Sequence, residues 1–258
     1  MPDPVRIPDI AGKAYLITGA STGIGAAVAI GFAEQGAKVA VHYHASEPEA
    51  RGVAHAVEKA GGRALMVRAD VTKRDAVFDM VDTVGKHFGQ IDGLINNAGT
   101  LLGRVPMEKG TEEHDYDVVD LNAMSVVWAT RAALPWLKKT KGVVISTSSL
   151  AARNGGGPGA VLYAASKAFV STFTRGFAKE VAADGIRVNA VEPGIILTRF
   201  HEVNTPTEQM KGIVAGIPMG RGATAEECVG VYLFLASNAM SSYITGQCIA
   251  VNGGQFSP

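Results

Sequence analysis

Short runs of β-branched and apolar residues alternate along the chain with longer segments of helical pattern. The pattern predicts strands at 13–18, 37–43, 63–70, 91–97, 142–147, 186–191 and 247–252. It predicts helices at 23–35, 47–60, 73–88, 115–139, 161–183 and 225–237. Parallel strands need a long crossover, usually a helix, so this alternation indicates a parallel sheet covered on both faces. We therefore expect an α/β fold with one doubly wound, parallel, seven-stranded sheet.

The same alternation predicts the domain organisation. Seven strands and their crossovers occupy nearly all of the 258 residues, which leaves no room for a second domain. Residues 1–10 contain three prolines and no apolar core, which indicates an N-terminal tail rather than a secretory signal. Residues 199–222 form the one long irregular segment, and long loops in compact domains are usually lids. We expect a substrate lid there.

The charge balance and the cysteines argue against several classes of protein. Lys and Arg together number 24, as do Asp and Glu, so there is no basic excess to bind a nucleic acid or an anionic membrane. No uncharged apolar run reaches the ~18 residues of a spanning helix. Cys228 and Cys248 fit no zinc-binding spacing. We expect free thiols, no metal site and a reducing, cytoplasmic setting.

The segment TGASTGIG, residues 18–25, joins the first expected strand to the first expected helix. Gly19 permits a tight turn, and Gly23 removes a side chain where a pyrophosphate would approach the backbone. Gly25 allows the helix and the sheet to pack closely. The helix that follows presents free N–H groups and a partial positive charge. The turn therefore predicts a dinucleotide-binding site.

The spacing T-G-x-x-x-G-x-G departs from the common G-x-G-x-x-G fingerprint and resembles that of the short-chain dehydrogenase/reductase family. Further segments typical of that family follow in order: Asp70, 96–99, Asn122, Ser149, 163–167, 193–198 and 243–254. The resemblance extends over residues 12–254 and implies a Rossmann fold. It also implies an NAD(P)-dependent oxidoreductase that interconverts a secondary alcohol and a carbonyl by hydride transfer.

Tyr163 and Lys167 are four residues apart in an expected helix, so their side chains share one face. A phenol has a pKa of about 10 in water, and a neighbouring ammonium lowers that pKa because it favours the phenolate. The resemblance makes Tyr163 the acid in reduction and the base in oxidation, with Lys167 supporting it and binding the nicotinamide ribose. It assigns Ser149 to the substrate oxygen, and Asn122 to a water that relays protons from Lys167.

The resemblance also implies which residues contact the cofactor. Around the pyrophosphate it assigns Gly19, Ser21, Thr22, Gly23, Ile24 and Gly25. Along the adenosine half it assigns Tyr43, Ser46, Asp70 and Val71, and where the fourth strand ends it assigns Asn97, Ala98 and Gly99. Around the nicotinamide half it assigns Tyr163, Lys167, Pro193, Gly194, Ile196 and Thr198.

The end of the second strand bears on which nicotinamide is bound. An acidic residue there selects NAD, and Tyr43 stands where NAD-preferring relatives usually carry Asp. His42, His44 and Ser46 can donate hydrogen bonds to a 2′-phosphate. These residues favour NADP(H) over NAD(H). Thr22, where many NADP-preferring relatives have Arg or Lys, and the nearby Glu47 favour NAD(H) instead.

The sequence leaves the substrate open. Asn154, Glu192 and His201 could join Ser149 in contacting a sugar, a polyol or a similar polar compound. A 3-oxoacyl or general ketone reductase using NADPH is the alternative, with an acyl carrier docking on Arg131, Lys138, Lys139 and Lys141. The interval from Ser149 to Tyr163 is one residue longer than in many relatives, in the segment 153–160 that borders the substrate. A regulator without turnover is disfavoured, because Ser149, Tyr163 and Lys167 are all present.

Assembly is predicted from the helix at 161–183. Phe169, Phe173 and Phe177 form a stripe that is typical of core packing. Beside the stripe lies a face of small residues that would let a neighbouring helix approach closely. The resemblance implies a homotetramer, and burying two faces in symmetric pairs would give D2 symmetry.

Overall fold

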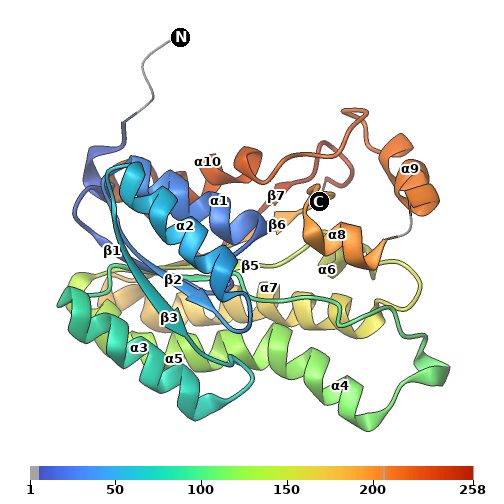
Figure 1. The fold of residues 1–258 in the computed structure, drawn as a ribbon, viewed down its shortest axis with the longest axis horizontal. Coiled ribbons are helices and arrows are strands. Elements are labelled where there is room, and N and C mark those ends of the chain that lie inside the picture. The colour runs from blue at the N-terminus through green and yellow to red at the C-terminus, as the bar shows by residue number, and fades with distance from the viewer. Residues whose placement is uncertain (1–5, 206, 258) are drawn as a thin grey trace.

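The computed structural model of the chain describes residues 6–205 and 207–257. All seven expected strands form one parallel sheet in the order β3-β2-β1-β4-β5-β6-β7 (Figure 1). The strands are β1 Ala14–Ile17, β2 Lys38–Tyr43, β3 Arg63–Arg68, β4 Gly93–Asn96, β5 Val143–Thr147, β6 Arg187–Pro193 and β7 Cys248–Val251. The order reverses direction between β1 and β4, and ligands of such sheets bind at this switch point, outside the carboxyl ends of the strands.

Burial explains why the central strands are so apolar. Every residue of β1, β4, β5 and β6 is buried, whereas β3, at one edge of the sheet, has exposed residues at both ends. Strands covered on both faces must be apolar on both faces. Their sequences therefore form continuous apolar runs rather than alternating patterns, as in Ala14–Ile17.

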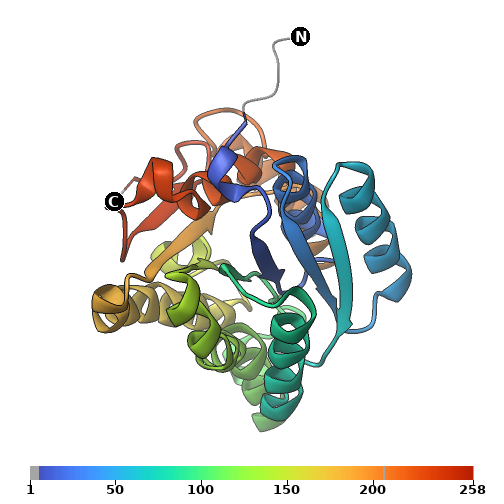
Figure 2. The same cartoon turned by 90° about the vertical axis from the view of Figure 1, so that its left-hand side faces the viewer.

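Helices cover both faces of the sheet, as expected. They are α1 Gly23–Glu34, α2 Glu47–Lys59, α3 Arg74–Phe88, α4 Glu112–Val119, α5 Ser125–Thr140, α6 Ala151–Asn154, α7 Val161–Val181, α8 Arg199–Asn204, α9 Thr207–Ala215, α10 Val229–Ala236 and α11 Asn238–Ser241. One core cluster joins α1, α2 and α10 to the sheet, and a second joins α3, α5 and α7 to its other face (Figure 2). The predicted doubly wound Rossmann fold is therefore confirmed.

The long helix expected at 115–139 is interrupted. Between α4 and α5 a π-helical turn spans Asp120–Met124 and contains Asn122. Turns of this kind are rare and occur frequently at functional sites. The extra residue in the turn was not visible in the apolar periodicity, because the helix continues in nearly the same direction on both sides.

The described part of the N-terminal segment belongs to the folded domain. Residues 1–5 lie outside the described part of the chain, but Ile7 and Ile10 are buried in the core, and Pro8–Ile10 forms a 3-10 turn. The Asp9 carboxylate accepts hydrogen bonds from Ser237 Oγ at 2.8 Å and from the Ala239 N–H at 3.0 Å. Residues 7–10 thus anchor the chain start to the C-terminal helices, which corrects the expected tail 1–10.

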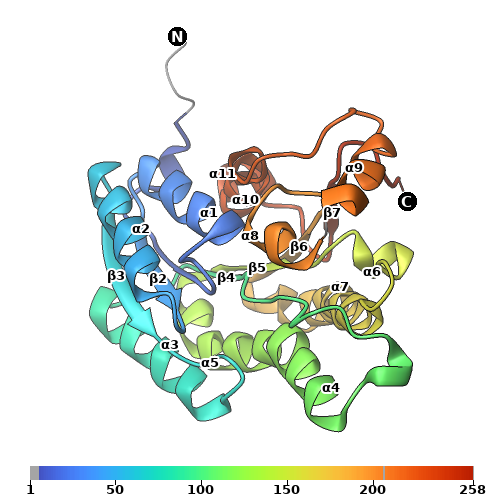
Figure 3. The ribbon, with the colours of Figure 1, turned by 45° about the vertical axis from the view of Figure 1, so that its right-hand side comes forward.

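The segment expected to be an irregular lid is mostly helical. It consists of α8 and α9, which lie beside β6 and β7 (Figure 3), while residue 206 lies outside the described residues. A short bridge pairs Ile196 with Ala223, so the segment leaves and rejoins the domain at neighbouring points. None of the helices in the described part of the chain combines the length and the apolar content that crossing a membrane requires.

Candidate active site

A cavity of about 930 Å³ opens at the carboxyl ends of the strands. Nearly every residue that the sequence analysis singles out lines it. Those on the cofactor side are Gly19, Ser21, Thr22, Gly23, Ile24, Tyr43, Ser46, Asp70, Val71, Asn97, Ala98, Gly99, Pro193, Gly194, Ile196 and Thr198. Those assigned to catalysis or substrate are Ser149, Asn154, Tyr163, Lys167 and His201. Three of the predicted site residues do not line the cavity: Gly25, Asn122 and Glu192.

The glycine-rich turn fits a dinucleotide pyrophosphate. Gly19 has φ +63°, and a Cβ there would lie 2.9 Å from Ala98 Cα, so the turn and the end of β4 pack without room for a side chain. A Cβ on Gly25 would clash with the Gly19 carbonyl, which explains that glycine although it lies behind the cavity. Thr22 is the N-cap of α1 but makes no capping bond with its side chain. Thr22, Gly23 and Ile24 line the cavity, so the uncapped N–H groups at the start of α1 are available there for phosphate oxygens.

A polar scaffold behind this turn was not anticipated. The Thr18 Oγ accepts from the N–H groups of Asn97 at 2.9 Å and Ala98 at 3.1 Å. The Asn97 side chain donates to the carbonyls of Thr18 and Gly19 at 3.0 and 3.1 Å. These bonds tie the end of β1 to the end of β4. The side chain of Asn97 therefore holds the turn in shape.

His42 lines the cavity, but both of its ring nitrogens have partners in the protein, which the sequence analysis did not expect. Its Nδ1 accepts from the Gly19 N–H at 2.9 Å, and Nε2 lies 3.1 Å from the Ala69 carbonyl. Burial lowers the pKa of His42 to about 4, so the imidazole is neutral, with Nδ1 as the acceptor and Nε2 as the donor. Both nitrogens are already bonded, so neither remains for a 2′-phosphate.

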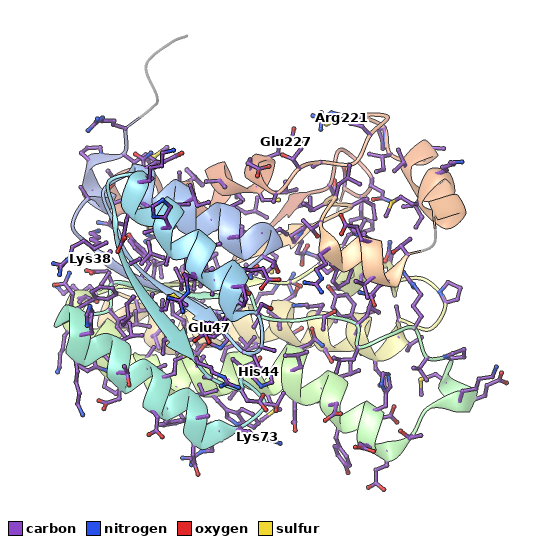
Figure 4. The ribbon with its side chains drawn as sticks, in the orientation of Figure 1. Lys38, His44, Glu47, Lys73, Arg221 and Glu227 are labelled. Atoms are coloured by element: carbon purple, nitrogen blue, oxygen red, sulfur yellow. The ribbon has the colours of Figure 1, made fainter. Side chains whose placement is uncertain are left out.

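Other groups surround the expected adenosine end. His44 is exposed where β2 ends (Figure 4). Burial by itself raises the pKa of Asp70. Hydrogen bonds from the Thr72 hydroxyl and N–H lower it, as do the charges of His44 and Lys73, and together they outweigh burial, so the pKa of Asp70 is lowered. Asp70 is thus an ionised hydrogen-bond acceptor. Arg68 donates to the His44 carbonyl at 3.1 Å, which orients the strand end.

Tyr163 and Lys167 lie inside the cavity, on the first turns of α7. Burial raises the pKa of Tyr163 to about 12, and a hydrogen bond with the Ser149 side chain opposes the rise. This is the reverse of the lowering that the sequence analysis expected, because the loss of water on burial outweighs the hydrogen bond that favours the phenolate. Burial also lowers the pKa of Lys167 to about 8. At neutral pH the tyrosine is protonated and can act as an acid.

Asn122 lies next to Lys167. Its Nδ2 donates to the carbonyls of Thr100 at 2.8 Å and Val118 at 2.9 Å, while Oδ1 is buried and accepts nothing from the described residues. A Cβ on Gly99 would lie 2.6 Å from this Oδ1 and 3.0 Å from Lys167 Nζ. Gly99 therefore keeps the space between the two polar groups open. The π-helical turn aims the amide into this space.

Glu192 does not reach the substrate side of the cavity. Its side chain is 3% exposed and accepts from Arg153 Nε at 2.9 Å and from Ser171 Oγ at 2.8 Å. Ser171 in turn bonds Ser148, so the carboxylate joins β6, α6 and α7. This corrects the expectation that Glu192 touches the substrate. Burial on both faces of β6 directs its side chain into the protein, where it is a structural ion-pair partner.

Two residues on the substrate side were missed by the sequence analysis. The Phe200 ring lies 5.7 Å from the Tyr163 ring, centroid to centroid, and lines the cavity from α8. Arg104 lines it from the segment that follows β4. Neither belongs to a motif, and only the position of Phe200 in the expected lid could have suggested it. The stretch around Arg104 carries no such signal.

The fold and this site together define a nicotinamide-dependent oxidoreductase. A family model described as enoyl-(acyl carrier protein) reductase matches residues 19–255. The hydroxynaphthalene reductase-like protein Arp2 of Metarhizium majus (strain ARSEF 297) is 37% identical over 258 residues, which cover 95% of each chain. The chain belongs to the short-chain dehydrogenase/reductase family, as its motifs predict.

Solved structures agree with this assignment. The NADH-dependent reductase A1-R′, described as responsible for alginate metabolism, superposes with a TM-score of 0.91 at 40% identity, covering 97% of this chain and 100% of that chain. A short-chain type dehydrogenase/reductase from Mycobacterium marinum gives a TM-score of 0.89 at 37% identity, covering 98% of each chain. The chain is therefore an NAD(P)-dependent reductase of this family, and a regulator without turnover is not retained.

Proposed function

We propose that the protein reduces an aldehyde or ketone to an alcohol, on a polar, oxygen-rich substrate of the sugar or polyol type. The observation that carries this proposal is the meeting of Ser149, Tyr163 and Lys167 in one cavity whose substrate side also contains Arg104 and His201. A bound nicotinamide supplies the hydride. The residues of the chain then have to orient the carbonyl and provide a proton.

Tyr163 donates that proton to the carbonyl oxygen. Its raised pKa keeps the phenol protonated at neutral pH, so the proton is present when the oxygen gains charge. The Ser149 hydroxyl, which is hydrogen-bonded with Tyr163, holds the same oxygen against the phenol. Lys167 stabilises the phenolate that forms, because its ammonium lies 5.7 Å from the ring centroid.

Reprotonation of the tyrosine involves Lys167 and Asn122. We propose that the free Oδ1 of Asn122 holds a water beside Lys167 Nζ, in the space that Gly99 leaves open. Lys167 would hold the ribose hydroxyls of the nicotinamide, and its ammonium is the group of this chain that could return a proton to the phenolate. The lowered pKa of Lys167, about 8, makes this transfer and the return of a proton from solvent easy near neutral pH.

For the cofactor we propose NADPH, with NADH as the second candidate. No carboxylate occupies position 43, and His44 and Ser46 remain as donors to a 2′-phosphate after His42 is removed from that role. Glu47 and the absence of a basic residue in the segment 18–25 favour NADH, as does the NADH dependence of the relative A1-R′. Titration of each reduced cofactor into the protein compares the two directly.

A reductase of 3-oxoacyl groups or general ketones is the alternative. The description of the matching family model and the reductase relatives favour it. Against this alternative, most of the basic residues considered for docking an acyl carrier lie on the opposite side of the sheet from the cavity opening. Lys138, Lys139 and Lys141 are at the end of α5, which precedes β5 and so lies at the edge opposite the cavity, and Lys138 is paired with Asp184 at 2.9 Å.

We also propose a homotetramer assembled partly through α7. The stripe expected in the core is only partly buried there: Phe177 packs against the core and Phe173 is half-buried, but Phe169 is 42% exposed, and the three rings stack along the helix. Such a patch on a helix favours burial against a second copy.

Both cysteines are free thiols, and the cytoplasmic location stays a prediction.

The first experiment follows the near-ultraviolet absorbance of the reduced cofactor. NADPH and NADH are each offered with aldoses, ketoses, simple ketones and β-keto esters. Turnover of sugars supports the proposal, whereas turnover of keto esters alone supports the alternative. The variant Tyr163→Phe should reduce turnover by about 10²-fold or more while its affinity for the cofactor stays nearly unchanged. Turnover that survives this change would remove Tyr163 from its assigned role.

A further inference from the structure

Arg104 joins three segments at the substrate side of the cavity. Its Nε donates to the carbonyl of Asn204 in α8 at 2.7 Å, and Nη1 donates to the Pro158 carbonyl at 3.1 Å. The next residue, Val105, donates its N–H to the Gly159 carbonyl at 3.0 Å. Gly159 has φ +71°, and a Cβ there would lie 2.9 Å from the Arg104 carbonyl carbon. The glycine allows this close approach, so the guanidinium is held in a defined position.

The guanidinium has donors left over and no counterion. It carries five N–H groups, of which the two carbonyls use one on Nε and one on Nη1. Asp70 and Asp117 are the acids that line the cavity, and no ion pair links Arg104 to them or to any other carboxylate of the described residues. By contrast, the other lining arginine, Arg199, has Glu49 at 3.6 Å. A half-buried cation without a partner favours an anionic ligand.

The neighbouring groups add hydrogen-bonding capacity without adding charge. Burial and the nearby Arg104 lower the pKa of His201, so its imidazole is neutral at pH 7. Its Nδ1 lies 3.2 Å from the Thr205 hydroxyl, which leaves Nε2 for a ligand. The side chain of Asn154 accepts from the Gly156 N–H and keeps its own Nδ2 donors. Among the described residues that line this end of the cavity, Arg104 therefore carries the positive charge that has no carboxylate partner.

We propose that Arg104 binds a carboxylate of the substrate, so the substrates are carbonyl compounds that also carry a carboxylate, such as sugar acids. The planar fork of a guanidinium matches the two oxygens of a carboxylate. The aldehyde or ketone group then lies at Ser149 and Tyr163, and the acid group lies between α8 and the segment 155–160. This inference rests on the reductase function proposed above and names its substrate class.

Binding tests the inference apart from turnover. The variant Tyr163→Phe, saturated with reduced cofactor, is titrated by calorimetry with D-glucuronate, D-glucose and D-glucose 6-phosphate, which differ only at carbon 6. Glucuronate is expected to bind about tenfold or more tightly than glucose, the typical value of a charged hydrogen-bonded contact. Adding Arg104→Gln to Tyr163→Phe should remove this difference in affinity between glucuronate and glucose. Adding Arg104→Lys instead should keep part of the difference. Arg74→Gln, which removes an exposed arginine of α3, should leave it unchanged.

Three outcomes would overturn the inference: equal binding of glucuronate and glucose, equal weakening of both by Arg104→Gln, or tightest binding of the phosphate ester. Equal weakening of both sugars would mean that Arg104 only holds the neighbouring loops in position. Tightest binding of the phosphate ester would identify a phosphate site instead. Circular dichroism of each variant checks that it is folded. Failure of the wild-type protein to turn over any carbonyl compound would contradict the proposed reductase function itself. This result does not depend on the ratio of glucuronate to glucose affinity, so the two failures can be told apart.

Discussion

Lys167 donates a hydrogen bond from Nζ to the backbone carbonyl of Thr147 at 2.8 Å. This bond joins the second turn of α7 to Thr147, the last residue of β5, two residues before Ser149. The ammonium is thus held at a fixed place beside the tyrosine before any cofactor is bound. Burial lowers the pKa of this ammonium to about 8, so its charge changes within a range of pH that kinetics can cover.

The rate of carbonyl reduction should fall as pH rises through about 8. Burial lowers the pKa of Lys167 to about 8, so above that pH the ammonium that supports Tyr163 is lost. The profile of kcat/KM for the carbonyl, measured with saturating reduced cofactor, checks this. Lys167→Arg should move the fall to higher pH, since a guanidinium stays protonated. A rate that is constant up to pH 10 would contradict the assignment.

Gly99→Ala should lower kcat by about 10²-fold, the size of effect that a small misplacement in an active site produces. The new Cβ would lie 2.6 Å from Asn122 Oδ1 and 3.0 Å from Lys167 Nζ. Gly99 does not have a positive φ, so the change tests space and not backbone strain. Steady-state kinetics and thermal unfolding of the same variant separate a local effect from a loss of folding.

Gly52→Ala is the matched control for that variant. Gly52 lies in α2, and a Cβ there would meet nothing within 4 Å. Alanine favours helix over glycine by about 0.5–1 kcal/mol, so this variant should be slightly more stable and fully active. If Gly52→Ala lost activity as Gly99→Ala does, the space between Asn122 and Lys167 would not be the cause.

Arg153→Met should lower the free energy of unfolding by about 2–4 kcal/mol, because it leaves the buried Glu192 carboxylate without its cation. The Arg153 side chain is 25% exposed and that of Glu192 is 3% exposed. Urea unfolding measures the change. Replacing both residues by methionine should recover much of the loss, since no unpaired charge remains.

The exposed pair Arg51–Glu47 is the control for this comparison. Its side chains are 71% and 52% exposed, so Arg51→Met should cost no more than about 0.5 kcal/mol. Equal losses for Arg51→Met and Arg153→Met would mean that the buried position of Glu192 does not matter to stability.

Phe169→Glu should reduce the oligomeric state in light scattering. The phenylalanine is 42% exposed in the stacked stripe of α7, and a carboxylate buried against a second copy would be costly. Val203→Glu, at a residue of α8 that is 71% exposed, should leave the oligomeric state unchanged. A wild-type protein that is a monomer at micromolar concentration would rule out the tetramer.

Several parts of the protein could be predicted from the sequence because they depend on residues close together in the chain. The strands and helices follow from short-range periodicity, and the glycine turn from backbone limits at Gly19 and Gly25. Tyr163 and Lys167 share a helix face because they are four residues apart, whatever surrounds them. These local rules were sufficient for the fold and the family, and nearly all of the residues that they assigned to the site line the cavity.

Only the tertiary structure decided the rest, because it depends on contacts between distant segments. His42 and Glu192 lie in strands covered on both faces, so periodicity could not tell which of their polar neighbours they would meet. The direction of the pKa shift of Tyr163 depends on how completely the folded chain removes water from it. Arg104 has its position only because α8 and the segment 155–160 both supply carbonyls to it, and such convergence of loops leaves no pattern in the sequence.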